Sequence, residues 1–217
     1  MTDFAILLAG PIEPTERLVR RVHERRVIAA DAGMRHAGPL GLTPELWVGD
    51  FDSAQFMPEA VDAIERLSFS RDKDQTDGEI AIEAAIERGA RNLLLVGALG
   101  GPRSDHAFAH LVLALRYAEA GFNVELFDGR EEGRPLRPGV PCRLDLAAGT
   151  PFSVLKFTDI SGLSIQGATY PLGGIDLPFT SILTQSNEAL GPITVRIETG
   201  RAILLAQSRP DEAGHVK

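Results

Sequence analysis

Short strand-like runs alternate with amphipathic stretches over the first 127 residues, and this alternation limits the possible folds more than any other feature of the chain. The runs expected to form strands are residues 4–9, 27–30, 46–48, 68–70, 92–96 and 123–127. The stretches expected to form helices are residues 14–26, 58–67, 76–88 and 105–120. Helices between successive strands favour an α/β fold, in which a mostly parallel sheet carries helices on both faces.

The pattern changes after residues 128–141, a segment rich in glycine, proline and charge. No helix is expected beyond it, and the strand-like runs are residues 152–157, 162–166, 193–198 and 202–206. Ile193, Val195 and Ile197 alternate with polar residues, which is the period of a strand with one buried face. We predict an α/β domain over residues 1–128, a linker over 129–141 and an all-β domain, a sandwich or barrel, over 142–217.

Composition narrows the classes of partner. The formal net charge of −8 gives the protein no overall field that attracts nucleic acid or an anionic membrane surface. No apolar segment approaches the roughly 20 residues that a transmembrane helix needs. Cys142 is the only cysteine, so no disulfide can form within the chain. We therefore expect a cytoplasmic protein with neither a nucleic-acid nor a membrane partner.

Polar residues gather where the expected strands of the first domain end. They are Asp31, Asp50, Asp52, Asp72, Asp74, Asp77, Arg103 and Asp105. Ligands of open α/β sheets bind in the crevice beyond the carboxyl ends of the strands. Several carboxylates meeting there repel one another unless a cation lies among them. Carboxylates without histidine and cysteine clusters suit Mg²⁺, which usually binds together with the phosphates of a substrate.

Two of the acidic segments have both a functional and a purely structural interpretation. Asp50 and Asp52 follow a strand and can point the same way, which suits one shared ion. The alternative is a turn whose aspartates cap backbone N–H groups. Asp77 falls in the first turn of an expected helix, where it either binds an ion or complements the helix dipole. Lys73 is either a phosphate contact or an exposed loop residue.

The loop between the strand at 92–96 and the helix at 105–120 is rich in glycine, and Arg103 lies in it. Glycines let backbone N–H groups approach phosphate oxygens, and Arg103 can neutralise charge on a transferred group. The alternative is a tight turn with Ser104 or Asp105 as the N-cap. His106 and His110 have a spacing that suits zinc, but no further ligands accompany them, so structural or solvent-facing roles are expected. The residues expected on the apolar side of the helix are Phe108, Leu111, Val112 and Leu115.

Four motifs together resemble the catalytic domain of the thiamin pyrophosphokinase family. They are Asp31-Ala32-Gly33, Gly49-Asp50-Phe51-Asp52-Ser53, Asp72-Lys73-Asp74-Gln75-Thr76-Asp77 and Gly100-Gly101-Pro102-Arg103-Ser104-Asp105-His106. The second part resembles the thiamin-binding domain of that family through Gly162-Leu163, Tyr170-Pro171-Leu172 and Ser186-Asn187-Glu188. The chain departs from the family at Gly10-Pro11, where a pair of glycines is common, and at Ala32, where a glycine is common.

The resemblance implies transfer of the diphosphate group of ATP to the hydroxyl of thiamin, giving thiamin diphosphate and AMP. It implies Mg²⁺ as the cofactor, held by Asp50, Asp52 and Asp77. It also implies a homodimer in which the α/β domain of one subunit and the β domain of the other share each active site. Arg103 would contact phosphate, and Asp105 would orient the thiamin hydroxyl or accept its proton. The substrate-binding residues that it implies are Asp31, Lys73, Asp74, Gly100, Gly101, His106, Ser186 and Asn187.

Two other functions remain open at this point. A related diphosphokinase that acts on another small alcohol would share the acidic motifs and differ in its β domain. A non-catalytic protein that binds thiamin or a nucleotide would release no AMP.

Overall fold

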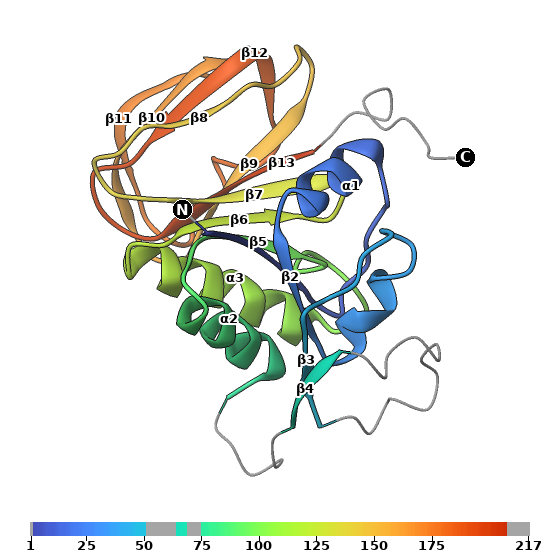
Figure 1. Cartoon of the computed structure of the whole chain (residues 1–217). Helices are drawn as coiled ribbons and strands as arrows, with labels where there is room; N and C mark the ends of the chain where they lie inside the picture. Colours follow the sequence, from blue (N-terminus) through green and yellow to red (C-terminus); the bar gives the residue numbers. More distant parts are fainter. Residues whose placement is uncertain (1, 51–63, 69–74, 208–217) are drawn as a thin grey trace.

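The computed structural model describes residues 2–50, 64–68 and 75–207, and one continuous sheet runs through it (Figure 1). Its parallel part has the strand order β6-β5-β1-β2-β3-β4. The bounds are β1 Thr2–Leu7, β2 Arg26–Ala30, β3 Leu46–Gly49, β4 Glu65–Ser68, β5 Ala90–Val96 and β6 Asn123–Phe127. The order reverses between β1 and β5, which is the topological switch point where open α/β sheets bind ligands.

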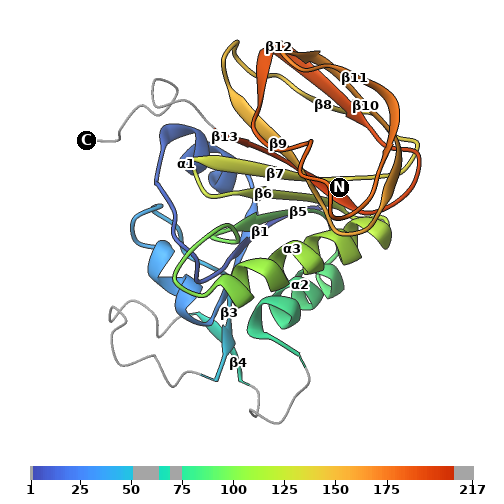
Figure 2. The same ribbon diagram turned by 180° about the vertical axis from the view of Figure 1, so that it is seen from behind.

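Helices cover both faces of this parallel sheet, as expected (Figures 1 and 2). One face carries α1 (Glu16–His23) and the 3₁₀ helix η1 (Asp31–His36), and the other carries α2 (Asp77–Glu87) and α3 (Ser104–Glu119). Alternate residues of β1 supply two cores: Leu7 packs with Trp47 under α1 and η1, whereas Ile6 packs under α2 and α3. The period of two in a strand thus places one apolar core on each face.

The start of α2 is fixed by its cap. The Thr76 hydroxyl accepts a hydrogen bond from the Glu79 N–H at 3.2 Å, so half of a capping box forms. The Glu79 carboxylate does not complete the box, because it pairs with Arg116 of α3 instead. Gly89 follows α2 at a φ of 91°, where it ends the helix as expected. Asp77 is consequently held at the first position of a capped helix.

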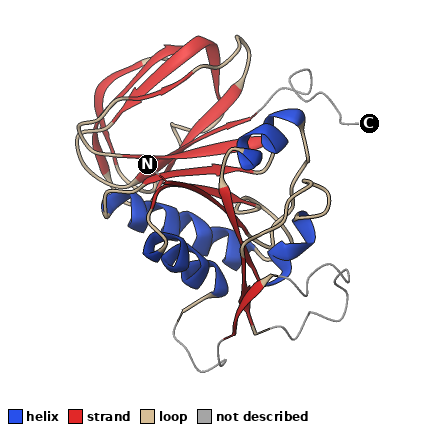
Figure 3. Ribbon diagram, in the orientation of Figure 1, coloured by secondary structure: helices blue, strands red, loops and turns tan. Residues whose placement is uncertain are grey.

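The rest of the described chain consists of antiparallel strands, and no α-helix is found among its described residues (Figure 3). They are β7 Glu131–Leu136, β8 Cys142–Leu144, β9 Pro151–Lys156, β10 Ile160–Ala168, β11 Leu172–Leu177, β12 Asn187–Arg196 and β13 Ala202–Gln207. Ile193, Val195 and Ile197 are fully buried, in agreement with their alternation in the sequence. Side chains from all seven strands form one apolar core. β7 joins this part to β6 through antiparallel pairing.

Two local predictions were wrong. Glu131–Leu136, inside the segment predicted as a linker, is strand β7. It has no apolar signature because Glu132 is buried in ion pairs and Gly133 lies where a Cβ would meet Leu126 at 3.0 Å. Glu65–Ser68, expected as the end of a helix and the start of a strand, is the edge strand β4, because pairing with β3 overrides helix propensity. β8 and β11 were not predicted.

The apolar side of α3 was also only partly predicted. Leu115 is buried together with Leu113, Ala114, Tyr117 and Ala118. Phe108 and Val112 are 59% and 41% exposed, because the first turns of α3 extend beyond the core. Among the described helices, none is long and apolar enough to cross a membrane.

A buried ion-pair cluster holds α1 against β6 and β7. Arg17 pairs with Glu132 at 2.7 Å, and Arg21 pairs with Glu132 at 3.5 Å and also with Glu125. The guanidinium groups of Arg17 and Arg21 both lie 4.8 Å from the centre of the Phe127 ring. The Glu132 side chain is only 4% exposed, so its charge depends on these arginines for compensation.

We predict that Glu132→Ala lowers the free energy of unfolding by about 3 kcal/mol, since it removes a buried carboxylate that is a counter-charge for both Arg17 and Arg21. Denaturant unfolding followed by circular dichroism measures the change. The matched control is Arg130→Ala, whose side chain is 80% exposed and should change stability by less than about 0.5 kcal/mol. Equal effects of the two substitutions would contradict the importance of the cluster.

Candidate active site

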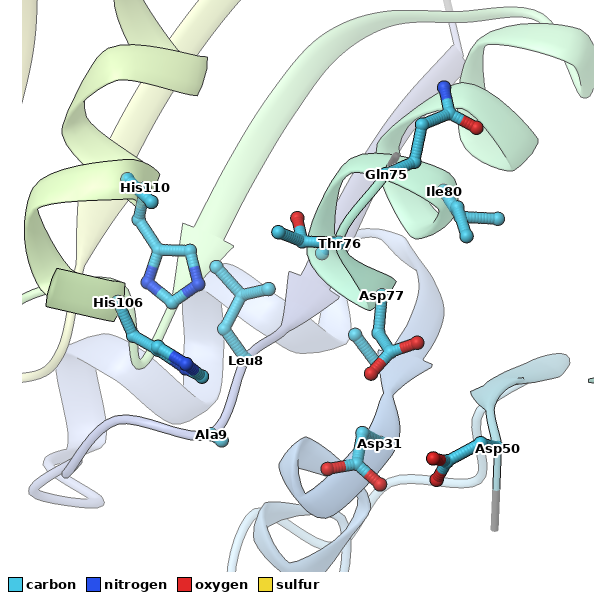
Figure 4. A pocket seen from close by; sticks show the side chains of 13 residues that line it. Leu8, Ala9, Asp31, Asp50, Gln75, Thr76, Asp77, Ile80, His106 and His110 are labelled. Atoms are coloured by element: carbon cyan, nitrogen blue, oxygen red, sulfur yellow. The ribbon is translucent and has the colours of Figure 1, made fainter. Parts of the chain in front are cut away.

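A cleft of about 320 Å³ lies at the carboxyl ends of β1, β2 and β3, next to the switch point (Figure 4). The starts of α2 and α3 close its other sides. The residues that line it are Leu8, Ala9, Ala30, Asp31, Asp50, Gln75, Thr76, Asp77, Gly78, Ile80, His106, Ala109 and His110. The cleft lies where the sequence predicted a ligand site.

Asp31, Asp50 and Asp77 come together on one side of the cleft (Figure 4). Asp31 directly follows β2 as the first residue of η1, at a φ of 43°, an unusual conformation for a residue with a side chain. The Trp47 indole N–H donates to the Asp31 carbonyl at 3.0 Å and helps to hold it there. Asp50 directly follows β3, and Asp77 begins α2. Three half-buried carboxylates from separate segments therefore face a shared space.

Packing explains why a glycine, Gly33, lies two residues after Asp31. A Cβ at Gly33 would overlap the carbonyl oxygen of Leu7, because η1 crosses the end of β1 at close range. This crossing sets Asp31 beside Leu8 and Ala9 at the floor of the cleft. The Asp-x-Gly pattern in the sequence is thus explained by backbone packing at the site.

The opposite side of the cleft presents two imidazoles from α3. His106, a predicted substrate-binding residue, is exposed, and His110 is half-buried one helical turn later. Burial lowers the pKa of His110 below its ordinary value. A structural or solvent-facing role was expected for His110, although its spacing of four residues from His106 already indicated a shared helix face. Gln75 and Thr76 also line the cleft and were not predicted as site residues.

Arg103 and Asp105 do not line this cleft. They lie in the exposed start of α3, where the guanidinium donates two hydrogen bonds to the carboxylate at 3.0 and 2.7 Å. This pairing holds the pKa of Asp105 well below its usual range. Gly100 lines a neighbouring cavity, and Gly101 follows it in the same loop. The N-cap predicted at Ser104 or Asp105 was wrong, since Arg103 occupies the cap position of α3 and no side chain caps the helix.

Ser186 and Asn187 lie at the start of β12 and likewise do not line the cleft. The Asn187 side-chain oxygen accepts from the N–H groups of Tyr170 and Glu188 at 3.1 and 2.9 Å, and its amide donates to the Tyr170 carbonyl at 2.8 Å. Asn187 is buried, so it joins two motif segments of the C-terminal part as a clamp. Ser186 is exposed at a φ of 60°.

Asp52, Lys73 and Asp74 fall outside the described residues, so the predicted set of Asp50, Asp52 and Asp77 is incomplete here. Among residues 2–50, 64–68 and 75–207, no group of three or more histidine, cysteine, aspartate or glutamate side chains has the arrangement of a metal site.

Two family descriptions match the two parts of the chain. Residues 21–126 match the catalytic domain of thiamin pyrophosphokinase, and residues 140–204 match its vitamin B1 binding domain. The chain belongs to the thiamin pyrophosphokinase family. Its activity is therefore the ATP-dependent formation of thiamin diphosphate, as the motifs implied.

Individual members of the family agree with this assignment. The thiamine pyrophosphokinase of Bacillus subtilis is 26% identical over 200 residues, which cover 88% of this chain and 91% of that relative. Its crystal structure aligns with a TM-score of 0.82 over 96% of this chain and 100% of that one, at 23% identity. The enzyme from Geobacillus thermodenitrificans aligns with a TM-score of 0.80 at 26% identity, covering 96% and 98% of the two chains. The Candida albicans structure shares the fold, with a TM-score of 0.77 at 13% identity, over 95% and 90%.

One prediction concerns the loop that borders the cleft. The buried His36 ring bonds to the Gly10 carbonyl at 2.8 Å through Nε2, and burial lowers its pKa. The unfolded chain therefore binds the proton more readily near pH 6.5, and the free energy of unfolding should fall as the pH drops from 7.5 towards 5. His36→Gln should make the free energy of unfolding depend less steeply on pH. His106→Gln, at an exposed position, should keep the steeper dependence of the wild-type protein. Identical slopes for all three proteins, from denaturant unfolding across this pH range, would contradict the prediction.

Proposed function

We propose that the cleft of Asp31, Asp50 and Asp77 binds the phosphate chain of ATP together with Mg²⁺. The observation that supports this proposal most directly is that these carboxylates, from three separate segments, converge at the carboxyl edge of the sheet. A phosphate chain is itself an anion, so it can bind here only if a cation lies between it and the acids. The family of the chain supplies ATP as the co-substrate.

The chemistry of the donor set fits Mg²⁺. Carboxylate oxygens are the preferred ligands of this ion, which keeps several waters and binds through one or two carboxylates plus phosphate oxygens. Asp50 and Asp77 would hold the ion, with Asp52, two residues after Asp50, as the third expected ligand. When bound, Mg²⁺ would supply positive charge against the phosphates. Asp31, which directly follows β2, contributes a third carboxylate beside those of Asp50 and Asp77.

The transfer itself is an in-line displacement at the β-phosphorus of ATP. The thiamin hydroxyl oxygen forms a bond to that phosphorus, and the bond from it to the oxygen bridging the α-phosphorus breaks. The electron pair of the broken bond leaves on AMP. Such a reaction depends on alignment and charge stabilisation more than on covalent participation by the protein. Backbone N–H groups at Gly100 and Gly101 and the side chains of Lys73, Asp74 and His106 position the phosphates.

Arg103 and Asp105 act by exchanging partners. Asp105 is a poor proton acceptor while Arg103 donates two hydrogen bonds to it. When Arg103 turns to the phosphate oxygens, Asp105 is released and its basicity rises. Asp105 then orients the thiamin hydroxyl and accepts its proton. The exposed position of both side chains leaves room for this rearrangement.

Thiamin binds against the C-terminal strands, which we interpret as a sandwich-like domain. A cavity of about 350 Å³ there is lined by aromatic and aliphatic side chains, among them Phe108, Phe157, Phe179 and Ile182, and by Gln185 next to Ser186. Aromatic rings suit both the pyrimidine of thiamin and its cationic thiazolium ring. Asn187 shapes this region by clamping the turn at Tyr170.

The thiamin cavity and the acidic cleft share no lining residue. Phe108 is two positions from both His106 and His110, so it lies on the other side of α3. Phe108, Phe179, Ile182 and Leu183 are between 57% and 76% exposed, which is unusual for neighbouring apolar residues on a monomer. These features support a homodimer in which the thiamin cavity of one subunit faces the acidic cleft of the other.

We place this enzyme in the cytoplasm, which suits its single, free cysteine. The proposed division at residues 128 and 142 into a nucleotide-binding and a thiamin-binding domain is supported by the two family matches, which cover residues 21–126 and 140–204. The same matches disfavour a diphosphokinase for another alcohol and a non-catalytic binding protein.

Incubation of the pure protein with thiamin, ATP and Mg²⁺ should give thiamin diphosphate and AMP in equal amounts. Chromatography distinguishes AMP from ADP, and ADP would indicate an ordinary kinase. Asp77→Asn should lower turnover by at least about a hundredfold without unfolding the protein, because it removes one charged metal ligand. The control is Asp145→Asn, an exposed position in the C-terminal part, which should keep near wild-type turnover. Near-normal turnover of Asp77→Asn would remove Asp77 from the metal site.

Subunit mixing tests the shared site. Asp77→Asn damages the cleft, and Gln185→Trp fills the thiamin cavity, so each homodimer should be inactive. In a mixed dimer one site carries both changes and the other carries neither. Random exchange should therefore restore about one quarter of wild-type activity. No recovery, with mixed dimers demonstrated by mass spectrometry, would mean that each chain builds its site alone.

A further inference from the structure

A second cavity opens at the same edge of the sheet as the acidic cleft. It has a volume of about 450 Å³, within the range of small-ligand sites. Three loops and two strand ends line it. The loops follow β1 at Ile12, β5 at Leu99 and β6 at Asp128, and the strand ends are Glu131 at the start of β7 and Gln207 at the end of β13. It therefore lies on the other side of the β1 and β5 loops from Asp31 and Asp77.

The backbone at Ala9, Gly10 and Gly97 lies between the two cavities. The cleft ends at Leu8 and Ala9, and the second cavity begins at Pro11. Between them the Gly10 N–H donates to the Gly97 carbonyl at 2.9 Å. A Cβ on Gly10 would overlap that carbonyl oxygen, and one on Gly97 would lie 2.6 Å from the Leu8 carbonyl oxygen. Neither glycine carries a side chain, and Arg35 and His36 bond to the neighbouring carbonyls of Ala9 and Gly10. An extended ligand can therefore cross this backbone, with the Arg35 guanidinium beside it.

The second cavity carries hydrogen-bond acceptors beside apolar walls. One Asp128 oxygen accepts from the N–H groups of Arg130 and Glu131 at 2.8 Å each. The carboxylate of Glu131 has no hydrogen bond to another described residue, and burial and the charge of Asp128 raise its pKa. Ile12 and Leu99 supply apolar surface. A ligand with a flat apolar part and two neighbouring hydroxyl donors matches this combination.

We infer that this second cavity binds the nucleoside of ATP, with the ribose diol donating to Glu131 and the base lying against Ile12 and Leu99. The inference rests on the proposed function, because it needs the phosphate chain in the acidic cleft. The α-phosphate then lies over the Gly10–Gly97 crossing, and the β- and γ-phosphates reach Asp31, Asp50 and Asp77. AMP leaves from the nucleoside side while the diphosphate stays with the carboxylates. Glu131 is thus a specificity-determining residue for the nucleotide.

The test compares ATP with 2′,3′-dideoxy-ATP as donors to thiamin, in the wild-type protein and in Glu131→Gln. The wild-type enzyme should prefer ATP by about tenfold in kcat/KM, because the hydroxyls bond to a charged acceptor. Glu131→Gln should reduce this preference to less than about threefold, mainly through a higher KM for ATP. Glu87→Gln, an exposed change of equal charge on α2, should keep the full preference.

Inhibition by inorganic tripolyphosphate separates the two cavities. Its inhibition constant should stay within about twofold in Glu131→Gln, since it occupies only the acidic cleft. An unchanged preference for ATP in this variant would overturn the inference. Equal weakening of tripolyphosphate and ATP would also overturn it, as would loss of Mn²⁺ binding measured without nucleotide. If the wild-type protein releases no AMP at all, the proposed function itself fails, which is a distinguishable result.

Discussion

Like charges held at one edge of a parallel sheet are the constraint from which the site follows. Asp31, Asp50 and Asp77 are placed there by the ends of β2 and β3 and by the capped start of α2, elements whose positions are set by two apolar cores. Carboxylates in a partly buried cleft raise the free energy of the folded chain unless a cation offsets their repulsion. The fold therefore keeps a charge arrangement that becomes favourable when a metal and a phosphate chain are present.

Glycines at two backbone crossings leave room for a ligand to reach these carboxylates. Gly33 lets η1 cross β1, and Gly10 and Gly97 bring the first and fifth strand loops into direct hydrogen-bonding contact. Because no Cβ projects at these glycines, a ligand longer than either cavity can extend from one cavity into the other. The bulky side chains begin beyond them, at Ile12 and Leu99 on one side and at His106 and His110 on the other.

The sequence predicted the parallel sheet and the meeting of Asp31, Asp50 and Asp77, because buried parallel strands are apolar throughout and their ends share one edge. It missed β7, whose Glu132 and Gly133 are determined by ion pairs and by close neighbours distant in the sequence. It placed Phe108 in the core, because helical periodicity does not reveal that the first turns of α3 lack a covering element within one chain. The pairing of Arg103 with Asp105 depends on side-chain geometry and could not be predicted from motifs.

The central claim is that one cation lies among the three carboxylates and grips the phosphates of ATP. A crystal structure with Mn²⁺ and a non-hydrolysable ATP analogue tests it through the anomalous signal of manganese. The account predicts a peak about 2 Å from carboxylate oxygens of Asp50 and Asp77 and from phosphate oxygens of the analogue. A nucleotide bound elsewhere, or a manganese peak with no protein carboxylate as a ligand, would contradict it.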